Sequence, residues 1–155
     1  MGLSKTLLKS IRNLSLDLRP AMLDDFGLVP ALEAHIERFS KQTGVEIELT
    51  SAGTLRRLPG LLEITAFRVV QEALTNVVRH AHVQAASVHV SFEPDRLVLQ
   101  ITDRGEGFEV SPLLEKPVSS GLSGMKERVN LAGGSLEIDS TPGTGTRVQV
   151  VLPYV

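Results

Sequence analysis

One stretch of the sequence places a carboxylate, an amide and an imidazole at a regular spacing of four residues. Glu72, Asn76 and His80 follow one another in this way, with Arg68 one step before them and Arg79 beside them. Residues four apart lie above one another on an α-helix, so these side chains form one polar stripe on a helix. Such a stripe is typical either of a solvent-facing surface or of a site for a charged, polar ligand.

The helix that carries this stripe is predicted over residues 61–82. Neither Gly nor Pro interrupts residues 67–81, and apolar residues recur at the spacing of one helical face. A second apolar row indicates contact on another side as well. The first row is Ala66, Val69, Val70, Ala73, Val77 and Ala81, and the second is Phe67, Leu74 and Val78. Unpaired buried polar groups are costly, which favours a partner for the stripe, but this helix alone leaves both interpretations open.

Three glycine-rich turns follow. Asp103-Arg-Gly-Glu-Gly107 comes at the end of a predicted strand, where the carboxylate could accept a hydrogen bond from an exocyclic amine and the glycines let the backbone approach a flat ligand. Gly121-Leu-Ser-Gly124 opens a predicted helix, whose exposed N–H groups and positive end favour a phosphate. Lys126 and Arg128 follow it, and Gly143-Thr-Gly-Thr146 forms the third turn. Each turn alone is also typical of an ordinary strand end, hinge or hairpin.

The elements around these motifs predict an α+β fold, a two-layer sandwich in which a mixed β-sheet carries helices on one face. Residues 23–28 are predicted to be a linker that bends at Gly27, and residues 108–120 a mobile loop. The predicted helices are 3–19, 28–42, 61–82 and 121–131, and the predicted strands are 45–50, 87–93, 96–102, 135–139 and 147–152.

Composition limits the classes of function. A net charge of −2 and an aromatic content of 4% argue against a nucleic-acid binder. The absence of cysteine excludes disulfides and thiolate metal sites and fits a reducing compartment. No apolar run approaches the roughly 20 residues of a membrane span. We therefore expect a cytoplasmic domain without membrane contact of its own, from which an upstream membrane or sensor segment could have been removed.

The N-terminal stretch has a separate character. Residues 3–19 carry apolar residues at Leu3, Leu7, Ile11, Leu14 and Leu18, a seam close to a heptad pattern, before Pro20 stops the helix. A helix of this length is marginal alone, so it should pack either on the domain or on another copy of the chain, which would give a homodimer. We expect residues 1–26 to be the remnant of a dimerisation helix with its linker, and residues 27–155 to be the main domain.

Taken together, these motifs give the chain a specific resemblance. In their order and spacing they are similar to those of the ATP-binding catalytic domain of sensor histidine kinases, in the superfamily that includes DNA gyrase, MutL and the heat-shock chaperone ATPases. Glu72-x-x-x-Asn76 with Arg79-His80 resembles the family's asparagine box, and the three glycine-rich turns resemble its glycine boxes. The stretch from Gln71 to His80 and the run Gly-Leu-Ser-Gly-Met-Lys-Glu-Arg from Gly121 are most similar to the nitrate-sensor and DesK-like subfamily.

The resemblance implies a Bergerat-type ATP-binding fold preceded by a helix, and a role for each motif. Asn76 would hold Mg²⁺ through its amide oxygen, and Glu72 would orient a metal-bound or attacking group. Asp103 would accept a hydrogen bond from the adenine amine, with Thr146 assisting through a water, and residues 109–120 would form a lid over ATP. The remaining nucleotide-binding residues that the resemblance implies are Arg79, His80, Gly105, Gly107, Gly121, Leu122, Gly124, Met125 and Arg128.

In one respect the sequence departs from the family pattern. The family's phosphoacceptor histidine lies beside an acidic residue on a first dimerisation helix, and none of His35, His80, His82 and His89 has that setting. His35, His82 and His89 are expected to be surface residues. The resemblance then implies phosphoryl transfer from Mg-ATP to a histidine on the dimerisation helix of a parent kinase, and from there to the receiver domain of a response regulator. A serine kinase of the anti-sigma-factor type and a non-catalytic nucleotide-binding or dimerisation module are the alternatives.

Overall fold

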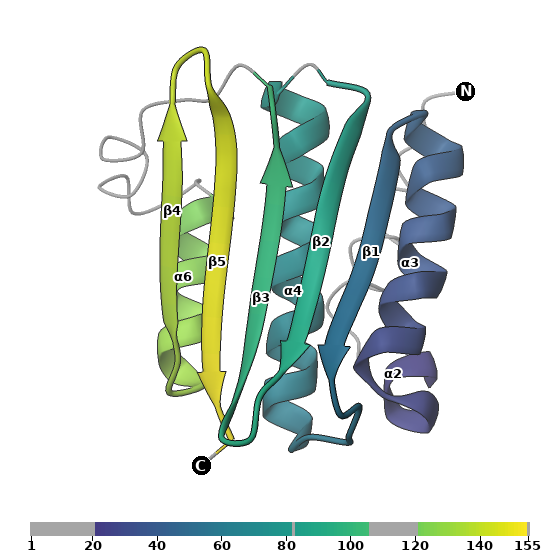
Figure 1. The fold of residues 1–155 in the computed structure, drawn as a ribbon, viewed down its shortest axis with the longest axis vertical. Coiled ribbons are helices and arrows are strands. Elements are labelled where there is room, and N and C mark those ends of the chain that lie inside the picture. The colour runs from purple at the N-terminus through teal and green to yellow at the C-terminus, as the bar shows by residue number, and fades with distance from the viewer. Residues whose placement is uncertain (1–20, 82, 106–120, 155) are drawn as a thin grey trace, which may run out of the picture.

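The computed structural model describes residues 21–81, 83–105 and 121–154 of the 155-residue chain. The described part is a five-stranded sheet with helices that precede or connect its strands (Figure 1). Its helices are α2 (Ala21–Phe26), α3 (Leu28–Thr43), α4 (Gly60–Asn76) and α6 (Gly121–Leu131), and a π-helical turn, η1 (Val77–Ala81), continues α4. Its strands are β1 (Glu46–Gly53), β2 (Ala85–Phe92), β3 (Arg96–Asp103), β4 (Ser135–Thr141) and β5 (Gly145–Pro153).

The sheet is mixed and has the strand order β1-β2-β3-β5-β4. Strand β1 pairs with β2 in parallel, because α4 connects them, whereas the other pairs are antiparallel. The hairpins β2–β3 and β4–β5 are joined side by side through β3 and β5. Of the strands that the structure describes, β1 and β4 are therefore the edges, and β1 exposes Glu46 and Glu48 there.

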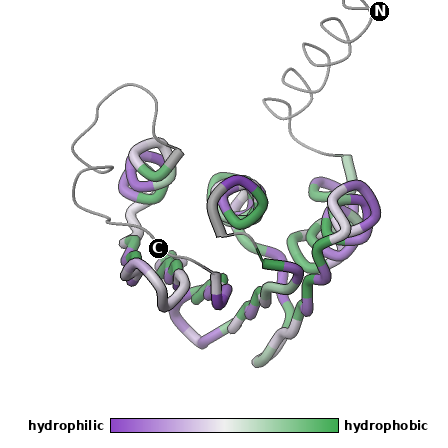
Figure 2. Tube along the Cα trace, turned by 90° about the horizontal axis from the view of Figure 1, so that it is seen from above, coloured by the Kyte–Doolittle hydropathy of each residue, from purple (hydrophilic) through white to green (hydrophobic). Residues whose placement is uncertain are grey.

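The helices lie on one side of the sheet, as predicted. Figure 2, seen from above, shows α3, α4 and α6 along the same side of the curved sheet. Alternate residues of the central strands point to that side and are buried against α4 and its neighbours. They include Val88, Val90, Leu97, Leu99, Ile101, Val148 and Val150. Each fully buried aliphatic side chain of this kind stabilises the fold by about 1.5–3 kcal/mol.

Helix α4 runs through the middle of the helical layer and carries the predicted apolar face. Ala66, Val69, Val70 and Ala73 are buried, and Phe67 and Leu74 are buried as well. Val78, the last residue of the second predicted row, is 41% exposed. The helix also changes geometry after Asn76, where η1 begins. The sequence predicts His80 to lie above Asn76, because residues four apart do so on an α-helix. The wider i→i+5 turn interrupts this spacing.

The stretch predicted as a linker is a short helix, so that prediction is wrong for residues 23–26. Helix α2 packs on α3 and α4, and Leu23 belongs to the same core as the sheet. The bend at Gly27 is confirmed, with a positive φ of 93°. The helix predicted over residues 3–19 lies outside the described residues, and the boundary after residue 26 stays a prediction.

An arginine and a buried glutamate fasten α2 to the start of α4. The Nε and Nη2 atoms of Arg57 lie 3.1 Å from the two carboxylate oxygens of Glu63, which is only 3% exposed. Arg57 also donates hydrogen bonds to the carbonyl oxygens of Leu23 and Asp24. A buried carboxylate requires such a partner, and the arrangement satisfies carbonyl groups at the end of α2.

The expectation that His35 is a surface residue is wrong. Its ring lies between α3 and α4, with centroids 5.6 Å from Phe67 and 5.9 Å from Phe39. Its Nε2 atom is buried without a hydrogen-bond partner among the described residues. Burial first, and then the charge of Arg38, lower the pKa of His35 below its usual value. His89 does lie on the outer, helix-free face of the sheet, where its Nδ1 is 2.7 Å from Thr50 Oγ1. His82 lies outside the described residues.

Candidate functional site

Three polar residues form a row at one end of the sheet, on the side that faces the helices. Asp103 is the last residue of β3 and lies opposite Thr146 of β5, which in turn lies opposite Ser140 of β4. Directly opposed residues of antiparallel strands point to the same face. Asp103 continues the buried alternation of Leu99 and Ile101, so all three side chains face the helical layer.

Asp103 is a buried carboxylate with two backbone donors. It is 7% exposed, its Oδ1 accepts a hydrogen bond from the N–H of Gly105 at 2.8 Å, and the N–H of Thr146 also donates to it. Burial raises the pKa of Asp103 above the usual value, and the two N–H donors oppose that rise without cancelling it. A carboxylate held in this way is a hydrogen-bond acceptor with a fixed direction at the end of the sheet.

Thr146 and Ser140 are linked by their hydroxyl groups, which lie 2.8 Å apart. Ser140 also donates to the carbonyl oxygen of Gly145 at 3.1 Å. Gly145 is buried and has a φ of +96°, and a Cβ atom there would meet the backbone of Asp103 and Arg104. Gly145 belongs to the third predicted glycine-rich turn, whereas Ser140 is not part of any predicted motif. The alternation Leu136, Ile138, Ser140 along β4 is the signal that could have placed Ser140 on the inner face.

The carboxyl end of α4 lies at the same end of the molecule as the end of β3 (Figure 1). Glu72 and Asn76 occupy its last turns and are half-buried, so their polar groups are accessible at the rim of the core. Arg79 on η1 is exposed. His80 lies on the same turn, and its side chain is outside the described part of the structure.

Helix α6 is described from Gly121, where the described residues resume, and its direction brings that end to the same side as the end of β3. Its last residue is followed by a tight connection to β4, whose hairpin turn lies beside Asp103. Among the described residues, and apart from the neighbouring backbone of α6 itself, no atom lies within 4 Å of the position that a Cβ atom on Gly124 would take. N–H groups at the start of a helix favour an anion, and the phosphate-binding role of Gly121–Gly124 stays a prediction.

Helix α6 carries three more residues that the sequence predicts to bind the nucleotide. Leu122 and Met125 are buried in the core, so they fix the helix on the sheet. Arg128 lies in the last turn of α6, about 10 Å along the axis from Gly121. The nucleotide-binding roles of Leu122, Met125 and Arg128 stay predictions. Gly107 and the predicted lid, residues 109–120, lie outside the described residues.

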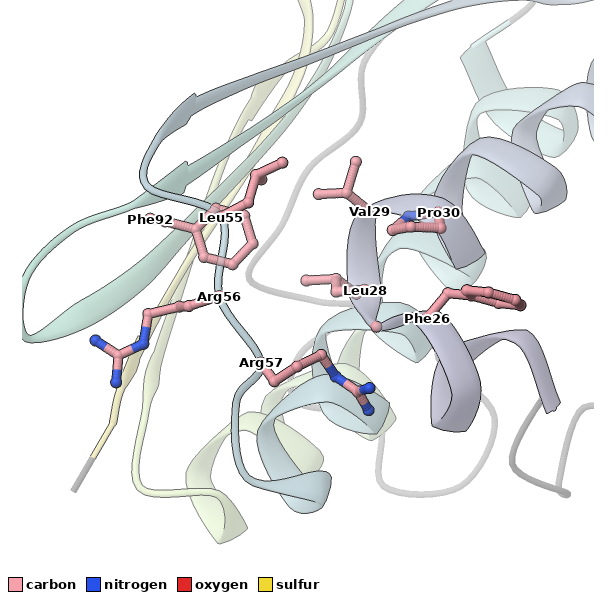
Figure 3. A pocket seen from close by; sticks show the side chains of 9 residues that line it. Phe26, Leu28, Val29, Pro30, Leu55, Arg56, Arg57 and Phe92 are labelled. Carbon is pink, nitrogen blue, oxygen red and sulfur yellow. The ribbon is translucent and has the colours of Figure 1, made fainter.

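A pocket of about 330 Å³ lies at the opposite end of the sheet and is not part of this row (Figure 3). It is lined by apolar side chains such as Phe26, Val29 and Leu55, with Phe92 at its wall. Phe92 pairs with Leu97, at the start of β3, whereas Asp103 pairs with Ala86 at the other end of the same hairpin. The predicted site residues do not line this pocket.

The polar residues at the end of the molecule where Asp103, Thr146 and Ser140 lie suit a nucleotide better than a metal ion held by protein side chains alone. Among the described residues, no group of three or more His, Cys, Asp or Glu side chains could hold a metal ion. A hard cation such as Mg²⁺ binds instead with few protein ligands and with substrate phosphate oxygens. The side-chain oxygens of Asn76 and Glu72 are of the right chemical type for that role.

Comparisons with known proteins agree with this interpretation. Residues 62–155 match the histidine kinase-, DNA gyrase B-, and HSP90-like ATPase family. The chain is 39% identical over 151 residues to the signal transduction histidine-protein kinase/phosphatase DegS of Brevibacillus brevis, covering 96% of this chain and 38% of that protein. It is 34% identical over 152 residues to the oxygen sensor histidine kinase NreB of Staphylococcus carnosus (strain TM300), covering 98% of this chain and 44% of that protein. The chain thus spans less than half the length of either relative.

Solved structures show the same fold. The histidine kinase domain of the blue-light activated histidine kinase from Erythrobacter litoralis EL346 superposes with a TM-score of 0.63 at 21% identity. The superposition covers 79% of this chain and 63% of that one. This likeness confirms the predicted two-layer α+β architecture.

Proposed function

Since this chain belongs to the histidine kinase-, DNA gyrase B- and HSP90-like ATPase family, we propose that it is the ATP-binding catalytic domain of a two-component sensor histidine kinase. The similarity to two named histidine kinases along nearly the whole chain supports this assignment within the family. Of the described residues, none forms a helix long and apolar enough to cross a membrane. A cytoplasmic location, where ATP is supplied, is part of the proposal.

The observation that carries the proposal is the buried Asp103 carboxylate at the end of β3. Its two backbone donors hold it as an acceptor, and an adenine has an exocyclic amine that can donate to it. A buried charge of this kind is costly to keep, which favours a functional reason for it. Gly105 carries no side chain, so a flat ring can approach the backbone beside Asp103.

The phosphates would lie between the start of α6 and the end of α4. The N–H groups of Gly121–Gly124 and the positive helix end favour anionic oxygens, and Arg79 would add a positive charge. Asn76 would bind Mg²⁺ through its amide oxygen, and Glu72 would orient a metal-bound or attacking group. The bound cation would neutralise the charge that develops on the transferred phosphoryl group.

Transfer needs an acceptor nitrogen in line with the γ-phosphate. We propose that this nitrogen belongs to a histidine on the dimerisation helix of a parent kinase, outside this chain, and that the phosphoryl group passes on to a receiver domain. His35 cannot serve as acceptor without leaving its position between α3 and α4. This chain should therefore bind ATP without labelling itself on histidine.

The test has two steps. Calorimetry should first show that the chain binds ADP and Mg-ATP. Incubation with radiolabelled ATP should then leave the chain unlabelled, whereas adding a polypeptide with the parent kinase's acceptor helix should give acid-labile, base-stable label on that polypeptide. Absence of nucleotide binding overturns the proposal. Label on a serine of an added protein would favour the serine-kinase alternative, and binding without any transfer would favour a non-catalytic module.

A further inference from the structure

A small hydrophobic cluster lies at the same end of the sheet as Asp103, separate from the main core. Its buried residues are Val45, Val77 and Ala86. Val45 directly precedes β1, Val77 is the first residue of η1, and Ala86 belongs to the first turn of the β2 ladder. The cluster therefore connects the turn after α4 to the starts of two neighbouring strands.

This cluster lies beside both parts of the proposed nucleotide site. Ala86 pairs with Asp103 across β2 and β3, and both are buried on the inner face of the sheet. Val77 follows Asn76 directly in the chain. The packing of three small apolar side chains thus relates the residue proposed to bind the cation to the strand that holds the residue proposed to bind the base.

Val77 anchors the turn that carries Asn76. Leu74 is the last residue of α4 in the main core. Among the described side chains from Thr75 to Arg79, Val77 alone is buried, whereas Asn76 is half-buried and Arg79 is exposed. On the side that faces the sheet, Val77 is therefore the contact that fixes this stretch.

The backbone geometry of the turn increases the importance of this anchor. Residues Val77–Ala81 form a π-helical turn, a rare geometry that is frequent at functional sites. Its hydrogen bonds do not continue the i→i+4 pattern of α4, so side-chain packing contributes to its position on the sheet. Val77 is the residue at which the two geometries meet.

We infer that Val77 is a positioning residue, which through the cluster with Val45 and Ala86 holds Asn76 at the distance from Asp103 that a nucleotide with bound Mg²⁺ requires. This inference rests on the proposed nucleotide-binding function. Asp103 would contact the base and Asn76 the cation at the phosphates, so one ligand spans both contacts. Residues that orient a metal ligand contribute to metal affinity without touching the metal.

The inference predicts a selective effect of Val77→Ala, which removes two methyl groups from the cluster. Strand β3 is held on both sides by β2 and β5, so Asp103 should keep its place. Asn76 should no longer be held in one position. Binding of the base should therefore persist, whereas the contribution of Mg²⁺ to ATP binding should fall.

The test measures, by calorimetry on the whole chain, the affinity for ATP in Mg²⁺ and in EDTA, together with the affinity for ADP in EDTA. The ratio of the two ATP affinities is the Mg²⁺ gain. In Val77→Ala this gain should fall by roughly tenfold, the lower end of the losses seen when a residue that orients a metal ligand is changed. The affinity for ADP in EDTA should be largely kept.

Three further variants separate positioning from loss of stability. Val90→Ala removes the same two methyl groups from the main core on the same strand as Ala86, so it should destabilise the fold in urea and keep the Mg²⁺ gain. Val77→Ile, which still fills the cluster, should also keep the gain. The double variant Val77→Ala with Ala86→Val returns the lost volume to the cluster and should recover most of the gain, and it serves as well if the single variant folds poorly.

Each outcome decides the matter. A wild-type Mg²⁺ gain in Val77→Ala, or an equal loss of the gain in the control Val90→Ala, overturns the inference while the proposed function stands. A wild-type chain that binds ATP equally in Mg²⁺ and in EDTA overturns the inference together with the metal-binding role of Asn76. A wild-type chain that binds neither nucleotide overturns the proposed function itself.

Discussion

The main chain of Gly145 passes so close to Asp103 that a Cβ atom on Gly145 would collide with the carbonyl oxygen of Asp103. It would also come within 2.8 Å of the α-carbon of Arg104. The two strand ends can therefore meet in this way only with a glycine at position 145, whose φ is +96°. The contact brings Thr146 opposite Asp103.

The close approach of Gly145 to Asp103 predicts that alanine substitutions at two neighbouring glycines change the free energy of unfolding by different amounts. Gly143→Ala changes a residue with a φ of +90° and open space around it, so it should cost only the left-handed backbone strain of roughly 1–2 kcal/mol. Gly145→Ala adds a steric clash and should cost at least roughly 1 kcal/mol more. Urea unfolding of both variants measures the difference. Equal free energies of unfolding would contradict the close approach.

Asp103→Asn should weaken ADP binding by about tenfold to a hundredfold, because a hydrogen bond to a charged acceptor contributes roughly 1.5–3 kcal/mol. Calorimetry measures this directly. Asp95→Asn, the same change at the exposed turn between β2 and β3, is the matched control and should bind ADP like the wild type. Wild-type affinity in Asp103→Asn would refute the adenine contact.

Asn76→Ala should remove the gain in ATP affinity that Mg²⁺ gives the wild type. Its amide oxygen is the proposed metal ligand, and the residue ends α4, so the helix should survive the change. Asn130→Ala, an exposed change on α6, provides the control. If Asn76→Ala still showed the full Mg²⁺ effect in titrations with and without the cation, another residue would hold the metal.

The raised pKa of Asp103 predicts a pH dependence of nucleotide binding. Only the ionised carboxylate can accept hydrogen bonds from an amine at both oxygens. The affinity for ADP should therefore be highest at pH values above the pKa of Asp103 and should fall as the pH drops through that pKa. Because burial raises that pKa, the fall should begin at a higher pH than an ordinary aspartate, with a pKa of about 3.9, would give. Titrations between neutral and mildly acidic pH should show this step in the wild type and not in Asp103→Asn.

His35 predicts a pH dependence of stability, because burial shifts its pKa in the direction opposite to that of Asp103. Its folded-state pKa is lowered by burial and by Arg38, so between its unfolded pKa of about 6.5 and the lower folded pKa the unfolded chain binds more protons. Its contribution to the free energy of unfolding is therefore complete above that unfolded pKa and is lost as the pH falls. Denaturation curves at several pH values should show a smaller acid loss for His35→Leu. An identical pH profile would show that His35 is not the responsible group.

The sequence predicts the long elements well, because their patterns are set by the core they build. The apolar rows of α4 and the alternation around Pro94-Asp95 lead to a buried helix and a hairpin, as the structure has them. The stretch around Asp24 and Asp25 has no such pattern, since α2 has a single deeply buried side chain, Leu23. Two of its carbonyl oxygens, those of Leu23 and Asp24, accept hydrogen bonds from Arg57, which is distant in sequence.

The chemistry of the site is only partly readable from motifs. Asp103 and Gly105 are recognisable because they are adjacent in sequence. Their relation to Ser140 depends on the register of two strand pairs, which no motif contains. The π-helical turn after Asn76 likewise has no sequence signal in Val77–Ala81, which continues the apolar and polar pattern of an α-helix.

The edge strand β1, with its exposed Glu46 and Glu48, affects how copies of this protein associate in concentrated solution. Strand β1 pairs only with β2 among the described strands, so its outer edge offers backbone groups to which another chain's strand could add. Glu46 and Glu48 are exposed on this strand, and charged side chains on an edge strand oppose the addition of another strand. A chain in which both glutamates are replaced by uncharged residues should therefore aggregate more readily through this edge than the wild type.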